Sequence, residues 1–155
     1  MTTLLTPDVE AFIGHVVTYV APEPLGRASI RYFVTAIGAD PDRWVDEAPP
    51  TLVCETTQLT GRTEPDADGY LGHTWNLPLP EPCTMIRGGN DYRFHRPVRP
   101  DDRITTTWTL TAMTERRDRD GAPMLIVTAR ADYGDEHADP IASNIETLIY
   151  RPDRP

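Results

Sequence analysis

The first strong hydrophobic pattern in the chain has the spacing of a helix. Four apolar residues recur at intervals of three and four positions and so share one helical face: Ile30, Phe33, Val34 and Ile37. Gly38 follows them and is a natural C-terminal stop. We therefore predict an amphipathic helix that ends at Gly38, with Arg27 and Arg31 away from its apolar face.

A shorter helix and a strand are predicted ahead of this one. Residues 7–13 have Thr6 as a suitable N-cap and Pro7 at the first helical position, and Gly14 ends the segment. Residues 16–20 form a short β-branched run that is typical of a strand.

Apolar and polar residues alternate with the period of a strand through the last third of the chain. The three alternating runs are Ile104, Thr106, Trp108, Leu110 and Ala112; Leu125, Val127, Ala129, Ala131 and Tyr133; and Ile141, Ser143, Ile145, Thr147 and Ile149. Asp120 and Gly121 mark a turn between the first two runs. An earlier strand contains Tyr92 and Phe94 and ends before a turn at residues 99–102. The pattern therefore predicts a long-stranded antiparallel sheet.

The middle of the chain is less regular. Residues 39–50 are rich in proline and acidic residues and are predicted to form a loop. Residues 51–57 suit a buried strand or a helix equally, and residues 60–84 are predicted to form a long loop. We predict one domain over residues 1–155, of the α+β class, with a curved antiparallel sheet.

The charge of the chain narrows the function classes. It carries 24 acidic against 15 basic residues, a net charge of −9, so we expect no nucleic-acid partner. All of the basic residues are Arg, so neither a P-loop lysine nor a Schiff-base lysine is available. Neither Ser29 nor Ser143 lies in a G-x-S-x-G motif, which excludes an α/β-hydrolase elbow.

Composition also bears on location and cofactors. No apolar run is long enough to span a bilayer, and the first residues lack the pattern of a signal peptide. We therefore expect a cytoplasmic protein without membrane contact. Cys54 and Cys83 belong to no C-x-x-C pair and are expected to be reduced thiols. No group of Cys, His and carboxylates has metal-site spacing, so we expect neither a metal nor a cofactor.

Three segments carry a family resemblance. Residues 87–104 combine an aromatic-His-Arg-Pro strand with a Pro-Asp-Asp turn, residues 30–51 join a helix to a Gly-acid-Pro loop, and residues 143–152 read SNIETLIYRP. The chain resembles the MaoC-like hot-dog family, and more closely its N-terminal, FAS1-like dehydratase branch, over about residues 7–152. The resemblance implies a hot-dog fold, in which a long sheet wraps around a central helix and forms half of a double hot dog.

The resemblance also implies a reaction, the reversible hydration of a 2-enoyl thioester to the 3-hydroxy compound. Active members of the family place an Asp and a His in the pattern G-D-x-N-P-x-H after the helix. Here Ala39 takes the place of the Asp and Trp44 that of the His. A shift by one residue offers Asp40, but Val45 then replaces the His. This absence of the dyad predicts a chain that does not catalyse hydration alone.

The function that we expect follows from this absence. The chain would be a subunit of a heteromeric (R)-specific 2-enoyl-CoA hydratase or 3-hydroxyacyl thioester dehydratase. A MaoC-like partner chain would supply the dyad in a heterodimer or heterotetramer, and the acyl-CoA substrate would need no further cofactor. This chain would contribute architecture and part of the acyl-binding surface.

Other residues are candidates for the site. Asp68 and His73, in the predicted long loop, form a weak candidate pair for acid–base chemistry. The candidate substrate-binding residues are Trp75, Arg87, Gly88, Gly89, Arg93, His95 and Arg96. Trp75 could cover an acyl chain, the arginines could bind phosphates of coenzyme A, and the glycines could let a pantetheine arm approach.

Each candidate has a structural alternative. The arginines could pair with Asp91, Asp101 and Asp102, the glycines could form a β-bulge, and His95 could be hydrogen-bonded at a subunit interface. Two other functions also stay open. One is a self-sufficient homodimeric hydratase, or a thioesterase that uses Glu55 or Asp46, and the other is a non-catalytic acyl-CoA-binding module.

Overall fold

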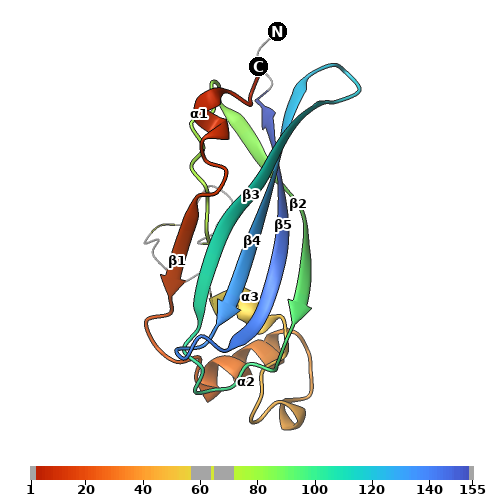
Figure 1. The fold of residues 1–155 in the computed structure, drawn as a ribbon. Helices are drawn as coiled ribbons and strands as arrows, with labels where there is room; N and C mark the ends of the chain where they lie inside the picture. The colour runs from red at the N-terminus through yellow and green to blue at the C-terminus, as the bar shows by residue number, and fades with distance from the viewer. Residues whose placement is uncertain (1–2, 57–63, 65–71, 154–155) are drawn as a thin grey trace.

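One five-stranded antiparallel sheet dominates the computed structural model, which describes residues 3–56, 64 and 72–153. The strands are β1 (Val16–Val20), β2 (Cys83–Phe94), β3 (Thr105–Arg117), β4 (Pro123–Gly134) and β5 (Pro140–Pro152). Their order in the sheet is β1-β3-β4-β5-β2, so β1 and β2 form the two edges (Figure 1). The α+β class and the antiparallel sheet predicted from the sequence are confirmed.

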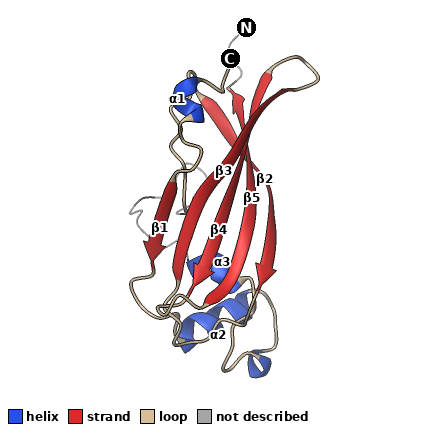
Figure 2. Cartoon of the chain, in the orientation of Figure 1, coloured by secondary structure: helices blue, strands red, loops and turns tan. Residues whose placement is uncertain are grey.

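The helices are short and lie at the ends of the sheet. They are α1 (Pro7–Glu10), α2 (Arg27–Ala36), α3 (Leu52–Thr56) and the 3₁₀ helix η1 (Pro41–Arg43). Figure 2 shows α2 and α3 at one end of the sheet and α1 at the other. Of the four residues predicted for the apolar face, Ile30 and Val34 are buried in α2 and Phe33 is partly buried against the core. The prediction is wrong for Ile37, which follows the helix and is 52% exposed. The sequence suits a strand or a helix equally over residues 51–57, and the structure has the helix α3 over residues 52–56.

The first helix is shorter than predicted. Thr6 caps it by accepting the N–H of Val9, but the helix ends at Glu10 instead of reaching residue 13. Residues 11–14 form turns because Gly14, at φ +88°, redirects the chain and donates its N–H to Leu110 of β3. Pairing with the sheet thus replaces the last helical turn.

The inward residues of β3 and β4 form most of the sheet's share of the core. Every residue predicted for the inner face of β4 is buried: Leu125, Val127, Ala129, Ala131 and Tyr133. In β3 the prediction is confirmed through Leu110 and is wrong for Ala112, which is exposed. A register shift between Leu110 and Ala112 reverses the alternation, so that Met113 is the next buried residue.

The phase predicted for the last strand is wrong over most of its length. Ile141 is buried as predicted, but Ile145 is 38% exposed. Asn144, Glu146, Leu148 and Tyr150 point into the core instead. The sequence pattern was misleading because Asn144 and Glu146 lie on the buried face, while Ile145 and Ile149 lie on the opposite face. A strand with both faces partly apolar has no unique periodic assignment.

Strand β2 begins earlier than the sequence indicated. The predicted loop over residues 60–84 gives way to β2 at Cys83. Its pairing with β5 shifts register between Arg87 and Gly89, which confirms a β-bulge at the glycine pair. A Cβ at Gly88 would lie 3.1 Å from the Thr147 carbonyl oxygen, so glycine allows the two strands to approach closely there. None of the helices within the described ranges is long and apolar enough to cross a membrane.

Candidate functional site

The loop after α2 holds its shape through main-chain contacts and apolar packing. Ala39 donates its N–H to the Val34 carbonyl at 3.0 Å and packs against the core. Asp40 caps η1 by accepting the N–H of Asp42 at 3.0 Å. Trp44 also packs against the core, and the Arg43 guanidinium lies 5.1 Å from the centre of its ring. Neither Ala39 nor Trp44 can transfer a proton, and the Asp40 carboxylate is already bound to the main chain.

The remaining acidic candidates are Asp46, Glu55 and Asp68, and the structure places none of them in a catalytic arrangement. Asp46 forms an exposed ion pair with Arg27, with 2.8 Å between the two groups. Asp68 and the side chain of Glu55 lie outside the described residues. Of the predicted Asp68/His73 pair, the structure therefore places His73 alone.

His73 lies in an aromatic cluster on the inner face of the sheet. Its Nδ1 is 2.8 Å from the Tyr19 hydroxyl. Its ring meets Trp75 edge-on, with 4.3 Å between centroids, and stacks on Trp108 at 5.3 Å. Trp75 is only 5% exposed. Trp75, predicted to cover an acyl chain, is therefore an interior residue with almost no surface of its own.

Burial decides the charge of His73. Desolvation lowers the pKa of its imidazole to about 4, so the ring is neutral at pH 7. A neutral imidazole has one donor and one acceptor nitrogen, and Nδ1 is bound to Tyr19. The other nitrogen, Nε2, has no hydrogen-bond partner in the part of the chain that the structure describes.

The inner face of β5 holds two more buried polar residues. Asn144 is 1% exposed and donates from Nδ2 to Asn90 Oδ1 at 2.7 Å. Glu146 is 5% exposed, and its Oε1 is 3.5 Å from Arg87 of β2. Burial raises the pKa of Glu146, and the nearby Arg87 guanidinium only partly opposes that effect. Arg87, a candidate for coenzyme A phosphates, therefore points toward a buried carboxyl group.

Other predicted residues lie along the exposed edge of the sheet. Gly88, Gly89 and Arg93 belong to β2, and all three are exposed. His95 follows the strand and donates its main-chain N–H to the Ile141 carbonyl at 2.8 Å, while its side chain is exposed. This edge is open to a ligand or to a second chain.

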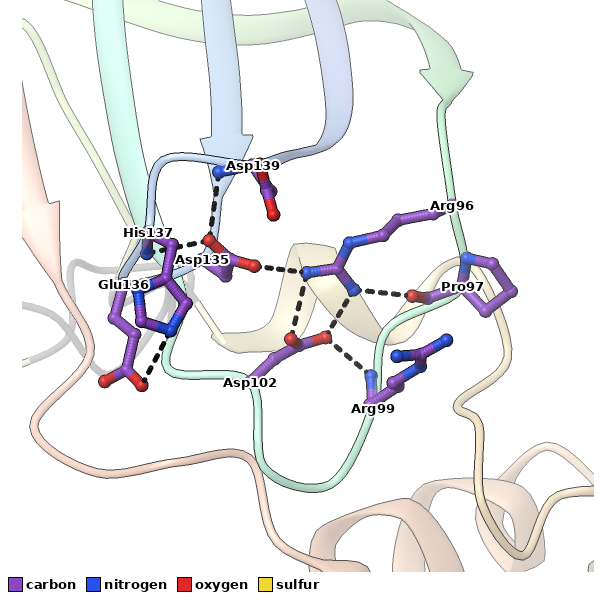
Figure 3. Close-up of polar contacts among 8 residues, drawn as sticks. All are labelled: Arg96, Pro97, Arg99, Asp102, Asp135, Glu136, His137 and Asp139. Carbon is purple, nitrogen blue, oxygen red and sulfur yellow. Dashed lines mark hydrogen bonds and ion pairs between the residues drawn. The ribbon is translucent and has the colours of Figure 1, made fainter.

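Arg96 is the most constrained of the predicted binding residues. Figure 3 shows its guanidinium between Asp102 and Asp135. It donates to both carboxylate oxygens of Asp102, at 2.7 and 2.9 Å, and to Asp135 at 2.9 Å. A further bond of 2.9 Å reaches the Pro97 carbonyl. Of the two expectations for Arg96, the geometry matches structural pairing with Asp102, and Asp135 is a second partner that the sequence did not indicate.

Comparison with known protein families identifies the family to which this chain belongs. Residues 11–144 match the family described as "FAS1-like, dehydratase domain region". The chain belongs to the FAS1-like dehydratase family. Two relatives called "UPF0336 protein" extend the match. The one from Streptomyces griseus is 27% identical over 92% of this chain and 94% of its own length, and the one from Streptomyces avermitilis is 26% identical over the same shares.

Solved structures confirm the hot-dog fold of this FAS1-like dehydratase chain. A chain of the ChsH1-ChsH2 complex from Mycobacterium tuberculosis superposes with a TM-score of 0.67 at 15% identity, covering 95% of this chain and 89% of that one. A MaoC-like dehydratase from Rhodospirillum rubrum gives 0.60 at 15% identity over 92% and 94%. The HadBC (3R-hydroxyacyl-ACP dehydratase) complex from Mycobacterium tuberculosis gives 0.59 at 18% identity over 89% and 96%.

Sequence reasoning missed three polar residues of the inner face. These residues are Tyr19, Asn144 and Glu146, whereas the site residues predicted from the sequence included His73 and the arginines. For the two residues of β5, the sequence did contain a signal. Asn144 and Glu146 share their phase with Leu148 and Tyr150, so two polar residues occupy the face of a strand that ends in large apolar side chains. Nothing in the sequence pointed to Tyr19 as the partner of His73.

Proposed function

We propose that this FAS1-like dehydratase chain is a subunit of a heteromeric 2-enoyl thioester hydratase or 3-hydroxyacyl thioester dehydratase. It lacks the catalytic dyad and contributes architecture and acyl-binding surface. The observation that carries the proposal is the loop after α2. By the resemblance, Ala39 and Trp44 take the places of the family's Asp and His there, and both side chains pack against the core.

The reaction explains why this loop decides the question. Hydration of an enoyl thioester needs a base that deprotonates water as it attacks C3 and an acid that protonates C2. In this loop the Asp40 carboxylate is bound to the main chain of η1, and Asp46 is paired with Arg27 at the surface. A partner chain with an intact dyad would supply both proton transfers.

The surface supports a partner. Strand β2 is a long edge, and most of its side chains are exposed. Apolar side chains are also exposed on α2 and in the loop after it: Tyr32 at 83%, Ile37 at 52% and Val45 at 54%. Exposed edges and apolar patches of this kind are typical of interfaces, and we expect the partner's sheet to continue from β2. Two of the similar chains come from complexes, ChsH1-ChsH2 and HadBC.

The test is hydration of crotonyl-CoA and of a longer 2-enoyl-CoA, followed as loss of enoyl absorbance. The purified chain is assayed alone and after addition of a MaoC-like chain that carries an intact G-D-x-N-P-x-H loop and is encoded beside it. We expect no turnover by this chain alone and turnover by the pair. In the pair, substitution of the partner's loop Asp should reduce kcat by about a hundredfold or more.

Other results would point elsewhere. Turnover by this chain alone, lost in His73→Gln, would overturn the proposal in favour of a self-sufficient hydratase. Acyl-CoA binding without turnover in either condition would favour a binding module.

A further inference from the structure

The face of the sheet that points away from the core is partly apolar. Four isoleucines of β2, β4 and β5 lie on it, each in the strand phase opposite to the residues packed on the core: Ile86, Ile126, Ile145 and Ile149. Ile86 is 42% exposed and Ile145 is 38% exposed. The outer face of an antiparallel sheet that meets only water is normally polar. These isoleucines therefore indicate that another protein surface covers the face.

Sheet register arranges this outer face in four rows. Each row crosses β4, β5 and β2 in that order, and the four sets of paired residues are Ile126, Ile149 and Ile86; Thr128, Thr147 and Gly89; Arg130, Ile145 and Asp91; and Asp132, Ser143 and Arg93. A Cβ at Gly88 would lie 3.2 Å from Thr147 Cγ2 and 3.3 Å from Ile149 Cδ1. Glycine at the bulge thus keeps a further side chain off this face.

The two charged rows have opposite sense. Arg130 of β4 lies across β5 from Asp91 of β2, whereas in the next row Asp132 lies across from Arg93. Arg130 binds Asp132 of its own strand through Nε and Nη2. Asp91 and Arg93 form no side-chain hydrogen bond or ion pair with any residue that the structure describes. The face therefore presents four alternating charges, two of which have no partner within that part of the chain.

We propose that this outer face binds the same face of a second copy of the chain, around a twofold axis that runs close to β5. Such an axis exchanges β4 with β2 and returns every row to its own level. Arg130 then faces Asp91 of the second copy, and Asp132 faces Arg93 of the second copy. Every charge of the two rows thus meets its opposite, which fixes the register of the contact.

The apolar residues match under the same operation. Ile145 and Ile149 of β5 lie near the axis and each meets its own counterpart, while Ile126 meets Ile86 of the second copy. Packed sheets of this kind cross at about 30°, so the rows near the axis fit best. A surface that complements itself in both charge and apolarity favours a second copy as the occupant over an unrelated protein.

A twofold axis perpendicular to the strands would also pair opposite charges. It would set Arg130 against Asp132 of the second copy and Asp91 against Arg93. However, it would carry the isoleucine row past the ends of β4 and β2, which stop at Gly134 and Phe94, and leave it uncovered. The isoleucine row therefore selects the axis along β5.

The proposed contact leaves the edge of the sheet free. It uses side chains on the outer face, whereas strand pairing at β2 uses main-chain groups in the plane of the sheet. The face contact can therefore join two chains whether or not each of them also binds the partner chain of the proposed function.

Two opposite charge changes test the contact in a way that misfolding cannot imitate. Asp91→Arg sets like charges against Arg130 of the second copy, and Arg130→Glu sets like charges against Asp91. Each variant alone should weaken self-association by about tenfold or more, because both symmetry-related ion pairs become repulsive. In an equimolar mixture, the new arginine faces the new glutamate and the two original residues face each other. We expect the mixture to associate as the wild type does in sedimentation velocity.

An apolar change tests the centre of the contact. Ile145→Glu places two carboxylates together at the axis and should also weaken self-association by about tenfold or more. Ile145 is used because β5 is an interior strand, so the change does not affect edge pairing. The controls are Ile13→Glu, at a turn residue with 40% exposure, and Glu23→Arg, at an exposed loop position, and both should associate as the wild type does.

Three results would overturn the proposal. The first is a wild-type chain that stays monomeric at about 100 μM. The second is unchanged self-association in both Asp91→Arg and Arg130→Glu, which would place the contact elsewhere, for example at the β2 edge. The third is a mixture that stays dissociated although circular dichroism shows both variants folded, which would exclude the twofold axis along β5.

Discussion

The guanidinium of Arg96 joins the connection between β2 and β3 to the β4–β5 hairpin through Asp102 and Asp135. Substitution Arg96→Met would leave two largely covered carboxylates without their cation, and uncompensated charges of this kind are strongly destabilising. We expect the melting temperature to fall by roughly 5 °C or more. Differential scanning calorimetry measures it.

The matched control for this substitution is Arg119→Met. Arg119 is exposed in the turn between β3 and β4 and takes part in none of the ion pairs identified among the described residues. The melting temperature of Arg119→Met should stay within about 1 °C of that of the wild type. Equal losses in the two variants would show that the Arg96 network contributes nothing specific.

His73 predicts a dependence of stability on pH. In the unfolded chain its imidazole takes up a proton near pH 6.5, whereas burial lowers the pKa in the folded chain to about 4. Between these values the unfolded state binds more protons, so His73 makes stability fall as pH falls, by about 2 kcal/mol from pH 7 to pH 5. Urea unfolding at both pH values measures the change.

The variant His73→Gln isolates this contribution. It removes the titrating group, so the difference between the wild-type and variant unfolding free energies should shrink from pH 7 to pH 5. A difference that stays constant over this interval would show that His73 is protonated in the folded chain as readily as in the unfolded one.

At the scale of elements, Glu115 of β3 holds the N-terminal segment. Its Oε2 accepts hydrogen bonds from the Thr3 hydroxyl at 2.8 Å and from the N–H groups of Leu4 and Leu5. Burial opposes the charged form, but the bonds from Leu5, Thr3 and Leu4 together keep the pKa of Glu115 below its usual value. This carboxylate therefore orders a segment whose Leu4 is fully buried.

We expect Glu115→Ala to release that segment. The amides of Leu4 and Leu5 should exchange with solvent at least about tenfold faster, because their acceptor is lost. Hydrogen exchange followed by NMR measures them, and Glu23→Ala, at an exposed loop position, is the control. Unchanged exchange in Glu115→Ala would assign the anchoring to Leu4 alone.

Element periodicity was predictable where one face of an element is clearly apolar. α2 and β4 fall in this class, because Ile30 and Val34 or the alternating row from Leu125 to Tyr133 leave one assignment. β5 does not, since Ile145 and Ile149 compete with Leu148 and Tyr150 for the core. The register shift after Leu110 in β3 left no mark in the sequence, and it moved Ala112 to the exposed face.

The site shows the same division. The loss of the dyad at Ala39 and Trp44 is inferred from local sequence alone, and it stays a prediction. The contact of His73 with Tyr19 joins residues 54 positions apart, and that of Arg96 with Asp135 joins residues 39 positions apart. Such pairs depend on sheet order, which periodicity does not determine.

At the scale of the molecule, the two sheet edges differ in what they offer a partner. β2 is 12 residues long and β1 only 5, so β2 presents the longer row of unpaired main-chain groups. We expect Ile86→Lys on β2 to weaken assembly with the proposed MaoC-like partner by about tenfold or more, because a lysine at an edge hinders strand pairing. Sedimentation velocity of the mixed chains measures the loss.

Val16→Lys is the matched change on the other edge. Val16 belongs to β1 and is 58% exposed, compared with 42% for Ile86. We expect Val16→Lys to leave assembly unchanged. Loss of assembly in Val16→Lys but not in Ile86→Lys would place the partner on β1.

The strand order has a consequence for synthesis. β2 is made before β3 and β4, yet among the described strands it pairs only with β5, the last of them to be translated (Figure 1). While the ribosome adds residues 95–139, β2 has no strand to pair with, and its closure waits for long-range contacts that form slowly. A nascent chain released before residue 140 would therefore expose a long unpaired strand, the kind of segment that chaperones bind and that aggregates in their absence.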